Sequence, residues 1–277
     1  KSGKEIIVTG DHSCIVFRNG KQLTIKAKDI NKSTDKILSI IMIYQFEEIE
    51  SIGIAFPGTV SNGIVIKAEN LGIENFKIVE ELNRKFDMPI HLENDAKCAA
   101  IAEKKYGSLK KYDDALFLII GTGIGGAVFL NGELLVPQKF EGFEIGHITI
   151  EKNGSQCNCG RYGCFEKYAS MSALKEKIEK AYGKESITGE ELKEILENTD
   201  NLEINKLVDE YIENLCIGIA NLINIFEPEA ICIGGSFSEY GNIFYEPLKE
   251  TLLQSNLLFN HRNEIIIKYA KLKNDAG

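Results

Sequence analysis

Apolar and polar positions along this chain alternate between short β-rich runs and longer segments with helical spacing. Runs of β-branched and aromatic residues predict strands, whereas apolar residues three or four positions apart predict helices. Asn19-Gly20 is typical of a hairpin turn between two strands. The expected elements of the first half are strands at 5–9, 14–17 and 22–26, a helix capped by Ser33 or Thr34, a strand at 52–56, a helix over 76–86, a strand at 90–93 and an alanine-rich helix ending near Tyr106.

The second half continues this order of strands and helices. A fully apolar strand is expected at 115–120, a second one before Asn131-Gly132, a long helix over 204–222, and a strand at 230–233 that ends in Gly234-Gly235. Glycines are concentrated where strands end, and this pattern favours an α/β fold.

A charged segment divides the chain. Residues 105–114 carry several lysines and aspartates together with a glycine. We therefore expect an N-terminal α/β lobe over residues 1–110 and a C-terminal α/β lobe over residues 111–277.

Composition narrows the class of protein. Hydrophobic residues make up 44% of the chain and charged residues 26%, as is usual in soluble globular proteins. The net charge is -9 and no basic patch stands out, so we expect no direct contact of this segment with nucleic acid. No apolar run approaches the roughly 20 residues of a membrane span. No signal peptide follows Lys1, so a cytoplasmic location is expected.

Three cysteines lie within eight residues, at Cys157, Cys159 and Cys164. Zinc in structural sites takes four nitrogen or sulfur ligands in a tetrahedron. Glycines within the segment permit a tight loop, and His147 is the nearest histidine able to complete the set. We expect a structural zinc site with these four ligands, because no open position is evident. The alternative is a loop of three reduced thiols.

Glu144 and Glu166 flank this cluster in the sequence. A carboxylate can accept hydrogen bonds from two neighbouring sugar hydroxyls. If His147 binds zinc through one ring nitrogen, its other N–H is fixed as a donor. The two glutamates are therefore candidate sugar ligands. Without the zinc site beside them, they would be interpreted as solvated surface residues.

Asn94-Asp95 stands between an expected strand and an expected helix. Asn and Asp are both preferred as helix caps, and this role alone would explain either residue. The alternative is that Asp95 acts as a general base, taking a proton from a hydroxyl nucleophile during phosphoryl transfer.

Gly121 to Gly126 form a glycine-rich turn directly after the apolar strand at 115–120. Backbone N–H groups of such a turn can hold phosphate. A dinucleotide-binding helix is excluded, because residues 127–130 continue as a strand. We expect a β-hairpin here. Gly234-Gly235 can admit a nucleotide close to the backbone, or be a simple turn.

Several segments together resemble one known family. They are GIAFPG beginning at Gly53, LENDAKCAA, GTGIGGAVFLNGEL, EIGH, CNCGRYGCFE, FEPEAICIGGS and the closing NDAG. In combination, from about Gly53 to Gly277, they are similar to the ROK family of bacterial sugar kinases and sugar-responsive repressors. The motifs are most like those of its glucokinase-like members.

The resemblance implies a fold, an activity and a set of residues. The fold would be the α/β actin/hexokinase-like (ribonuclease H-like) ATPase fold, with two lobes around a cleft. Asp95 would be the general base that deprotonates the 6-hydroxyl of a hexose or amino-hexose, with Mg-ATP as phosphate donor and a homodimer as the assembly. Residues implied in sugar binding are Gly58, Asn70, Asn94, Asp95, Glu144, His147 and Glu166, and those implied in nucleotide binding are Gly121, Thr122, Gly123, Gly125, Gly234 and Gly235.

The chain also departs from the family pattern. Val8–Ser13 stands where the family kinases have an Asp-x-Gly-Gly-Thr phosphate loop, and it lacks the double glycine. Lys97 stands where the family usually has Asn, and Phe143 replaces a small residue. The sequence ends at Gly277, before the final helix that the resemblance leads us to expect.

Two functions are consistent with this sequence. The first is an ATP-dependent hexose kinase, favoured by the intact 121–126 turn and Asp95. The second is a non-catalytic sugar-binding sensor or transcriptional regulator domain with a degenerate first phosphate loop. No helix-turn-helix signal stands within the 277 residues, so a regulator would need a DNA-binding module outside them.

Overall fold

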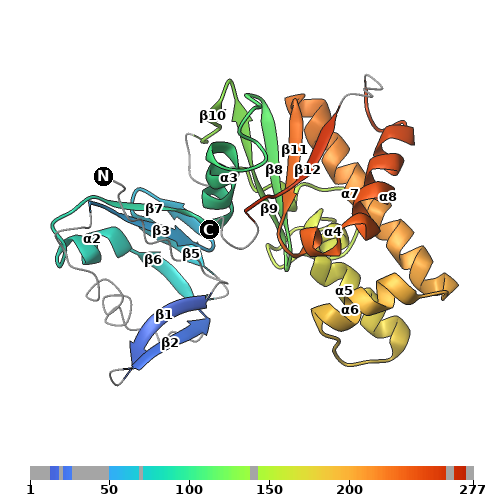
Figure 1. The fold of residues 1–277 in the computed structure, drawn as a ribbon, viewed down its shortest axis with the longest axis horizontal. Coiled ribbons are helices and arrows are strands. Elements are labelled where there is room, and N and C mark those ends of the chain that lie inside the picture. The colour runs from blue at the N-terminus through green and yellow to red at the C-terminus, as the bar shows by residue number, and fades with distance from the viewer. Residues whose placement is uncertain are drawn as a thin grey trace. The chain divides into compact units, whose positions relative to one another are not determined.

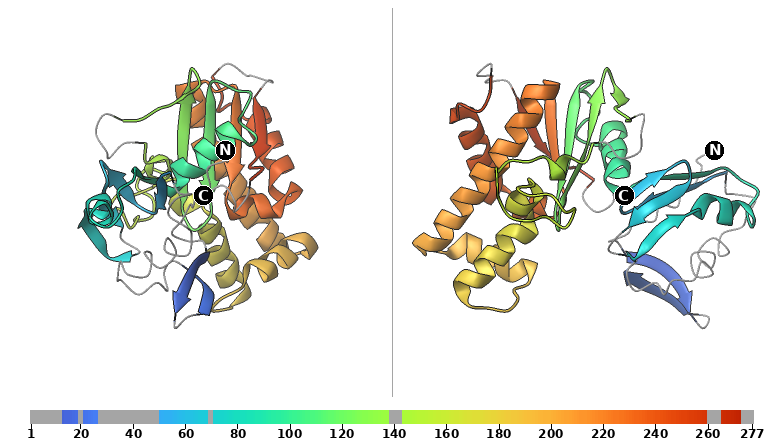
Figure 2. Two further views of the ribbon diagram at one scale, coloured as in Figure 1. Left: turned by 60° about the vertical axis from the view of Figure 1, so that its left-hand side comes forward. Right: turned by 180° about the vertical axis from the view of Figure 1, so that it is seen from behind.

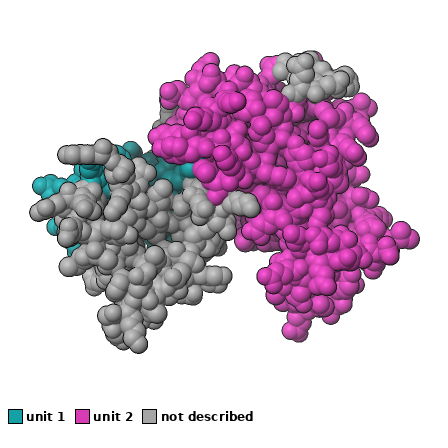
Figure 3. Space-filling model, in the orientation of Figure 1, with its two compact units in different colours: residues 1–102, 137–141, 274–277 teal, residues 103–136, 142–273 magenta. Residues whose placement is uncertain are grey.

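Two units make up the chain, and each is described by itself (Figures 1 and 3). Unit 1 combines residues 1–102, 137–141 and 274–277, and unit 2 combines residues 103–136 and 142–273. The computed structural model describes residues 13–18, 21–26, 50–68, 71–137, 143–259 and 265–272. Outside these ranges lie Asn70, the turn Asn19-Gly20, nearly all of the 8–13 segment, the strand predicted at 5–9 and the helix predicted to begin at Ser33 or Thr34.

In its described residues, unit 1 contains three small sheets and one short helix that lies wholly within it. Strands β1 and β2 pair antiparallel with Arg18 opposite Lys21, as the predicted hairpin requires. Strands β3 and β7 pair in parallel, and β4, β5 and β6 form an antiparallel meander. The elements are β1 (Ser13–Arg18), β2 (Lys21–Lys26), β3 (Ile52–Phe56), β4 (Thr59–Ser61), β5 (Ile64–Ala68), β6 (Ile73–Phe76), α2 (Ile78–Asn83), β7 (Ile90–Asn94) and α3 (Asp95–Lys105), which continues into unit 2.

The core of unit 1 explains where α2 begins and ends. Val65, Ile78 and Leu82 are buried in one apolar cluster with Phe86. The helix predicted over 76–86 is shorter in the structure, because Phe76 pairs with Val65 in the meander. Phe76 and Phe86, at the two ends of the predicted helix, thus pack in this core although they lie outside α2.

Unit 2 is built on a five-stranded sheet with the order β10-β9-β8-β11-β12 (Figures 1 and 2). Its central strands β8 and β11 are parallel, as are β11 and β12, whereas β9 is antiparallel to β8. The strands are β8 (Ala115–Ile120), β9 (Ile124–Leu130), β10 (Glu133–Leu134), β11 (Ala230–Gly234) and β12 (Ile266–Tyr269).

Helices cover this sheet, and α7 and α8 lie against one face of it (Figure 2). Leu118 of β8 and Ile233 of β11 are fully buried in one cluster with Leu215 and Ile219 of α7. Central strands that are buried on both faces require the continuous apolar runs seen in the sequence. The helical elements are the 3₁₀ turns η4 (Ile145–His147) and η5 (Ser236–Tyr240), and α4 (Glu166–Ala169), α5 (Met171–Tyr182), α6 (Gly189–Asn198), α7 (Leu202–Phe226) and α8 (Asn242–Gln254).

Helix α7 is the longest helix among the described residues, and local chemistry sets both of its ends. The side chain of Asn201 accepts a hydrogen bond from the N–H of Glu203 at 2.9 Å, which caps the first turn. At the other end Glu227 adopts a left-handed conformation with φ of 48°, and Pro228 follows. No helix in the described part of the chain has both the length and the apolar character needed to cross a membrane.

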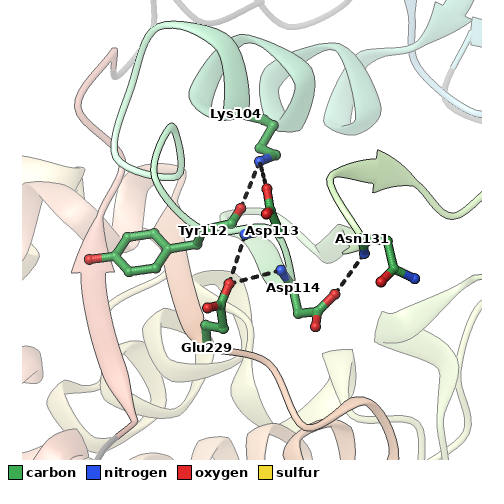
Figure 4. A network of polar contacts seen from close by, with 6 residues as sticks. All are labelled: Lys104, Tyr112, Asp113, Asp114, Asn131 and Glu229. Carbon is green, nitrogen blue, oxygen red and sulfur yellow. Dashed lines mark hydrogen bonds and ion pairs between the residues drawn. The ribbon is translucent and has the colours of Figure 1, made fainter.

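A polar network ties together the starts of β8 and β11 (Figure 4). Glu229 Oε2 accepts hydrogen bonds from the N–H of Asp113 at 2.7 Å and of Asp114 at 3.1 Å. Asp114 Oδ1 in turn accepts one from Asn131 N–H at 2.7 Å, and Lys104 Nζ donates to the carbonyl of Tyr112 at 2.7 Å. The network fixes the register of β8 and β11 at their amino ends, whereas the glycine turns lie at their carboxyl ends.

Replacing Glu229 tests how much this network stabilises the sheet. We expect Glu229→Ala to lower the free energy of unfolding by about 1 kcal/mol, since two backbone N–H groups lose a charged acceptor but stay within reach of water. Chemical denaturation monitored by circular dichroism measures the change. Glu250→Ala, at an exposed position of α8, is the matched control and should cost less than about 0.5 kcal/mol. Equal stability of the two variants would contradict the prediction.

Candidate functional site

Four side chains of unit 2 form a compact cluster of metal-binding type. The ligand atoms of His147, Cys157, Cys159 and Cys164 all lie within 4.8 Å of one another. Cys157 Sγ is 3.6 Å from His147 Nδ1, and Cys159 Sγ is 3.7 Å from Cys164 Sγ. These are the four residues that the cysteine spacing predicted to gather.

Backbone hydrogen bonds within the cysteine loop hold this arrangement. Cys157 N–H donates to the carbonyl of Arg161, and Gly160 N–H donates back to the carbonyl of Cys157. Gly160 and Gly163 have φ of 86° and 71°, a region that side chains rarely occupy. The two glycines therefore allow the loop to reverse tightly enough to bring Cys159 back toward Cys164.

The donor set and its spacing fit a tetrahedral zinc ion. Sulfur and nitrogen ligands about 2.0–2.3 Å from zinc lie about 3.5–3.8 Å apart at the corners of a tetrahedron, which agrees with both measured separations. Burial raises the pKa of the Cys164 thiol to about 12, and the neighbouring thiols of Cys159 and Cys157 add to the rise. A divalent cation acts in the opposite direction, because a coordinating thiol loses its proton.

The two candidate sugar carboxylates, Glu144 and Glu166, flank the segment 147–164 that contains the four clustered side chains. Glu144 is exposed and precedes the turn η4, whose last residue is His147. Glu166 is half-buried and begins α4, two residues after Cys164. Phe143, where the family has a small residue, adopts φ of 64°, and its ring packs against the core 6.3 Å from that of Phe226. Burial of this ring offsets the cost of a left-handed conformation.

In unit 1, Asn94 and Asp95 stand at the carboxyl end of the parallel pair β3 and β7. Asn94 Nδ2 donates to the carbonyl of Gly58 at 3.0 Å, while its Oδ1 accepts from Lys97 N–H at 3.1 Å. Asn94 is thus the cap of α3. Asp95 is the first helical residue, and its Oδ1 accepts from Ala96 N–H at 2.9 Å. The structure brings Gly58, Asn94 and Asp95 together.

Lys97, the other departure from the family pattern in this region, forms an ion pair with Glu93 at 3.8 Å. The pair flanks the start of α3.

The two glycine turns lie next to each other at the carboxyl ends of β8 and β11. Gly121–Gly123 connect β8 to β9 in a tight hairpin, as predicted, and Ile119 pairs with Gly234. Gly235 has φ of 75°, and a Cβ there would collide with the carbonyl of Ile120. Thr122 is exposed at the tip of the first turn. At the carboxyl ends of β8 and β11, the exposed surface is therefore formed largely by the backbone of these two turns.

Sequence analysis missed two features of this region. The carboxylate of Glu166 accepts a hydrogen bond from Ile124 N–H at 3.0 Å, although the two residues are 42 positions apart. Ser236 Oγ lies 3.7 Å from the position of a Cβ on Gly121, which places Ser236 beside the first turn. No local pattern indicates either contact, because each one depends on how the segments pack.

The fold and these turns define the class of protein. A solved structure of a ROK hexokinase from Thermus thermophilus matches with a TM-score of 0.75 and 26% identity, covering 92% of this chain and 86% of that one. The chain thus has the actin/hexokinase-like α/β fold of sugar kinases, as its motifs implied. The ROK family profile matches residues 6–277, and the chain belongs to this family.

Relatives in the family include both kinases and repressors. A β-glucoside kinase of Listeria monocytogenes is 33% identical over 271 residues, which cover 95% of this chain and 89% of the relative. A xylose repressor of Caldicellulosiruptor bescii is 31% identical over 241 residues, covering 81% of this chain. The match spans only 59% of the length of that repressor.

Proposed function

We propose that this chain is an ATP-dependent hexose kinase of the glucokinase-like kind, which phosphorylates the 6-hydroxyl of glucose or a related hexosamine. The observation that carries the proposal is the place of Asp95. It opens α3 directly after β7, at the carboxyl end of a parallel strand pair, where α/β proteins bind their ligands. Asn94 Oδ1 accepts the N–H of Lys97, so the capping bond of this helix comes from Asn94 and not from Asp95.

Asp95 would act as the general base. Its carboxylate takes the proton of the 6-hydroxyl as that oxygen attacks the γ-phosphorus, and the bond between the γ-phosphorus and the β–γ bridging oxygen breaks to release ADP. Protein groups contribute mainly by positioning the reactants and by electrostatic stabilisation.

In unit 1, the residues assigned to sugar binding are Gly58 and Asn94, which are joined by a hydrogen bond, with Asn70 implied by the family. In unit 2, the residues assigned to sugar binding are Glu144, Glu166 and His147. The Nδ1 atom of His147 faces the thiol cluster, so its Nε2–H is the donor left for a hydroxyl.

The nucleotide would bind along the two glycine turns of unit 2. Gly121, Thr122, Gly123 and Gly125 are assigned to the phosphates, and Gly234 and Gly235 to the adenosine side. Mg²⁺ bound with ATP would neutralise the charge of the phosphates. A structural zinc ion is assigned to His147 and the three cysteines, where it would stabilise the loop.

A second candidate is a sugar-binding sensor or transcriptional regulator domain without catalysis. It is supported by the similarity to a xylose repressor and by the absence of the double glycine from Val8–Ser13 in the sequence. Both candidates bind a sugar, so sugar binding does not distinguish them.

Turnover distinguishes the two candidates. We expect ATP-dependent ADP release, measured in a coupled assay, with at least one of glucose, N-acetylglucosamine, N-acetylmannosamine, fructose and allose. Calorimetric titration with each sugar runs in parallel. Absence of turnover with every one of these sugars in the presence of Mg-ATP, together with demonstrated binding of a sugar, would refute the kinase and favour the sensor.

A further inference from the structure

Glu166 makes a contact that its candidate role as a sugar ligand does not require. Its Oε2 accepts a hydrogen bond from the N–H of Ile124 at 3.0 Å. Ile124 is the first residue of β9 and follows the turn Gly121–Gly123 directly. One carboxylate oxygen of a candidate sugar ligand thus holds the candidate phosphate turn by its backbone.

Gly123 provides a second, independent observation of the same contact. A Cβ built on Gly123 would overlap Glu166 Oε2 and lie 3.0 Å from Glu166 Cδ. By contrast, the nearest atom to a Cβ on Gly121 is Ser236 Oγ at 3.7 Å, an ordinary contact. Gly123 is not among the glycines with positive φ. The glycine at position 123 is therefore needed for the approach of the Glu166 carboxylate and not for backbone conformation.

The other side of the turn is also fixed. Gly121 accepts a hydrogen bond on its carbonyl from Met171 N–H at 3.0 Å, at the start of α5. Glu166 and Met171 are the first residues of the consecutive helices α4 and α5, so one stretch of chain holds both ends of the turn. In the part of the chain that the structure describes, Glu166 Oε1 has no hydrogen-bond partner, so this oxygen can accept a hydroxyl.

We propose that Glu166 is a positioning residue that couples sugar binding to nucleotide binding. Oε2 holds the Gly121–Ile124 turn, and Oε1 accepts a sugar hydroxyl. A bound sugar restricts the carboxylate and thereby orders the turn. Because coupling free energy is reciprocal, sugar and nucleotide then raise each other's affinity by the same factor. The identity of the two ligands rests on the proposed function, whereas the contact between Glu166 and Ile124 does not.

The first experiment needs no ligand and measures hydrogen exchange at the amide of Ile124. We expect Glu166→Ala to speed this exchange on the order of tenfold, because a hydrogen bond to a charged acceptor is lost. Glu166→Gln should rescue slow exchange, since an amide oxygen can still accept from Ile124. Gly123→Ala should speed exchange by displacing the carboxylate, and Gly121→Ala is its matched control, with little expected effect.

A double-mutant cycle decides whether Gly123 acts through Glu166. Once the carboxylate is absent, a methyl group at position 123 has nothing to displace. The variant carrying both Gly123→Ala and Glu166→Ala should therefore exchange at the rate of Glu166→Ala alone. Additive effects of the two substitutions, or unchanged exchange in Glu166→Ala, would overturn the proposal.

The second experiment measures the coupling itself. Calorimetry gives the affinity for AMPPNP with and without saturating glucose, or whichever hexose of the assay panel binds. We expect the sugar to tighten AMPPNP binding about tenfold in the natural chain and not at all in Glu166→Ala. Independent binding of both ligands to the natural chain would refute the coupling. If no hexose binds, the proposed function and the coupling both fail, while the exchange result still decides whether Glu166 holds the turn.

Discussion

Asp95→Asn is expected to lower kcat by about 10³-fold and to change sugar affinity by less than about threefold. An amide has the shape of the carboxylate and keeps an oxygen for the N–H of Ala96, but it cannot take a proton. Steady-state kinetics with Mg-ATP and calorimetric titration of the sugar measure the two quantities separately. Asp87→Asn, at an exposed position of the same unit, is the control and should leave both unchanged.

The structure also separates this role of Asp95 from helix capping. Asn94 Oδ1 accepts the N–H of Lys97, so the capping bond does not depend on Asp95. A loss of stability in Asp95→Asn without loss of kcat would mean that Asp95 is only structural. A kcat above a tenth of the natural value would show that the base is another group.

Cys164→Ser is expected to abolish zinc binding and to weaken sugar affinity more than tenfold. Cys164 is a fully buried member of the cysteine cluster, two residues before Glu166, and it pairs with Thr149 in an isolated β-bridge. Without the ion, the loop loses the cross-link that fixes His147 and both flanking glutamates. Because metal binding contributes directly to folding, the melting temperature should fall on the order of 10 °C.

Elemental analysis, thermal denaturation and sugar titration test this expectation together. Chelation of the natural chain should reproduce the effect, and added zinc should reverse it there but not in Cys164→Ser. Cys216→Ser is the matched control, since Cys216 is also buried but lies in α7, outside the cluster. Unchanged sugar affinity in a chain shown to be free of zinc would refute the link between the metal and the sugar ligands.

Elements with a strong periodic pattern could be predicted from the sequence. The strand at 115–120 and the helix α7 follow from uninterrupted apolar runs and from helical spacing. The meander β4–β6 was not predicted, because its strands have only three to five residues and one is interrupted by a register shift. Strand β12 was missed too, although Ile266 and Ile267 belong to a β-branched run in the sequence.

The same distinction applies to the site. The gathering of the three cysteines was predictable because they are close in sequence, and the structure brings His147 to them. The hydrogen bond between Glu166 and Ile124 was not, because it joins the first residue of α4 to the first residue of β9, which are 42 positions apart in the sequence. The position of Asn94 at a strand end was foreseen, but its bond to Gly58 required the parallel pairing of β3 with β7.

The parallel pairing of β8 with β11 has a consequence for how this chain emerges from the ribosome. Ala115 pairs with Ala230, so more than a hundred further residues must be synthesised before β11 can pair with this edge of β8. At typical rates of translation the delay is on the order of ten seconds. Strand β9 follows at once and can shield the other edge by hairpin formation. During synthesis, the apolar segment 115–120 is thus a natural binding target for a chaperone that recognises exposed strands.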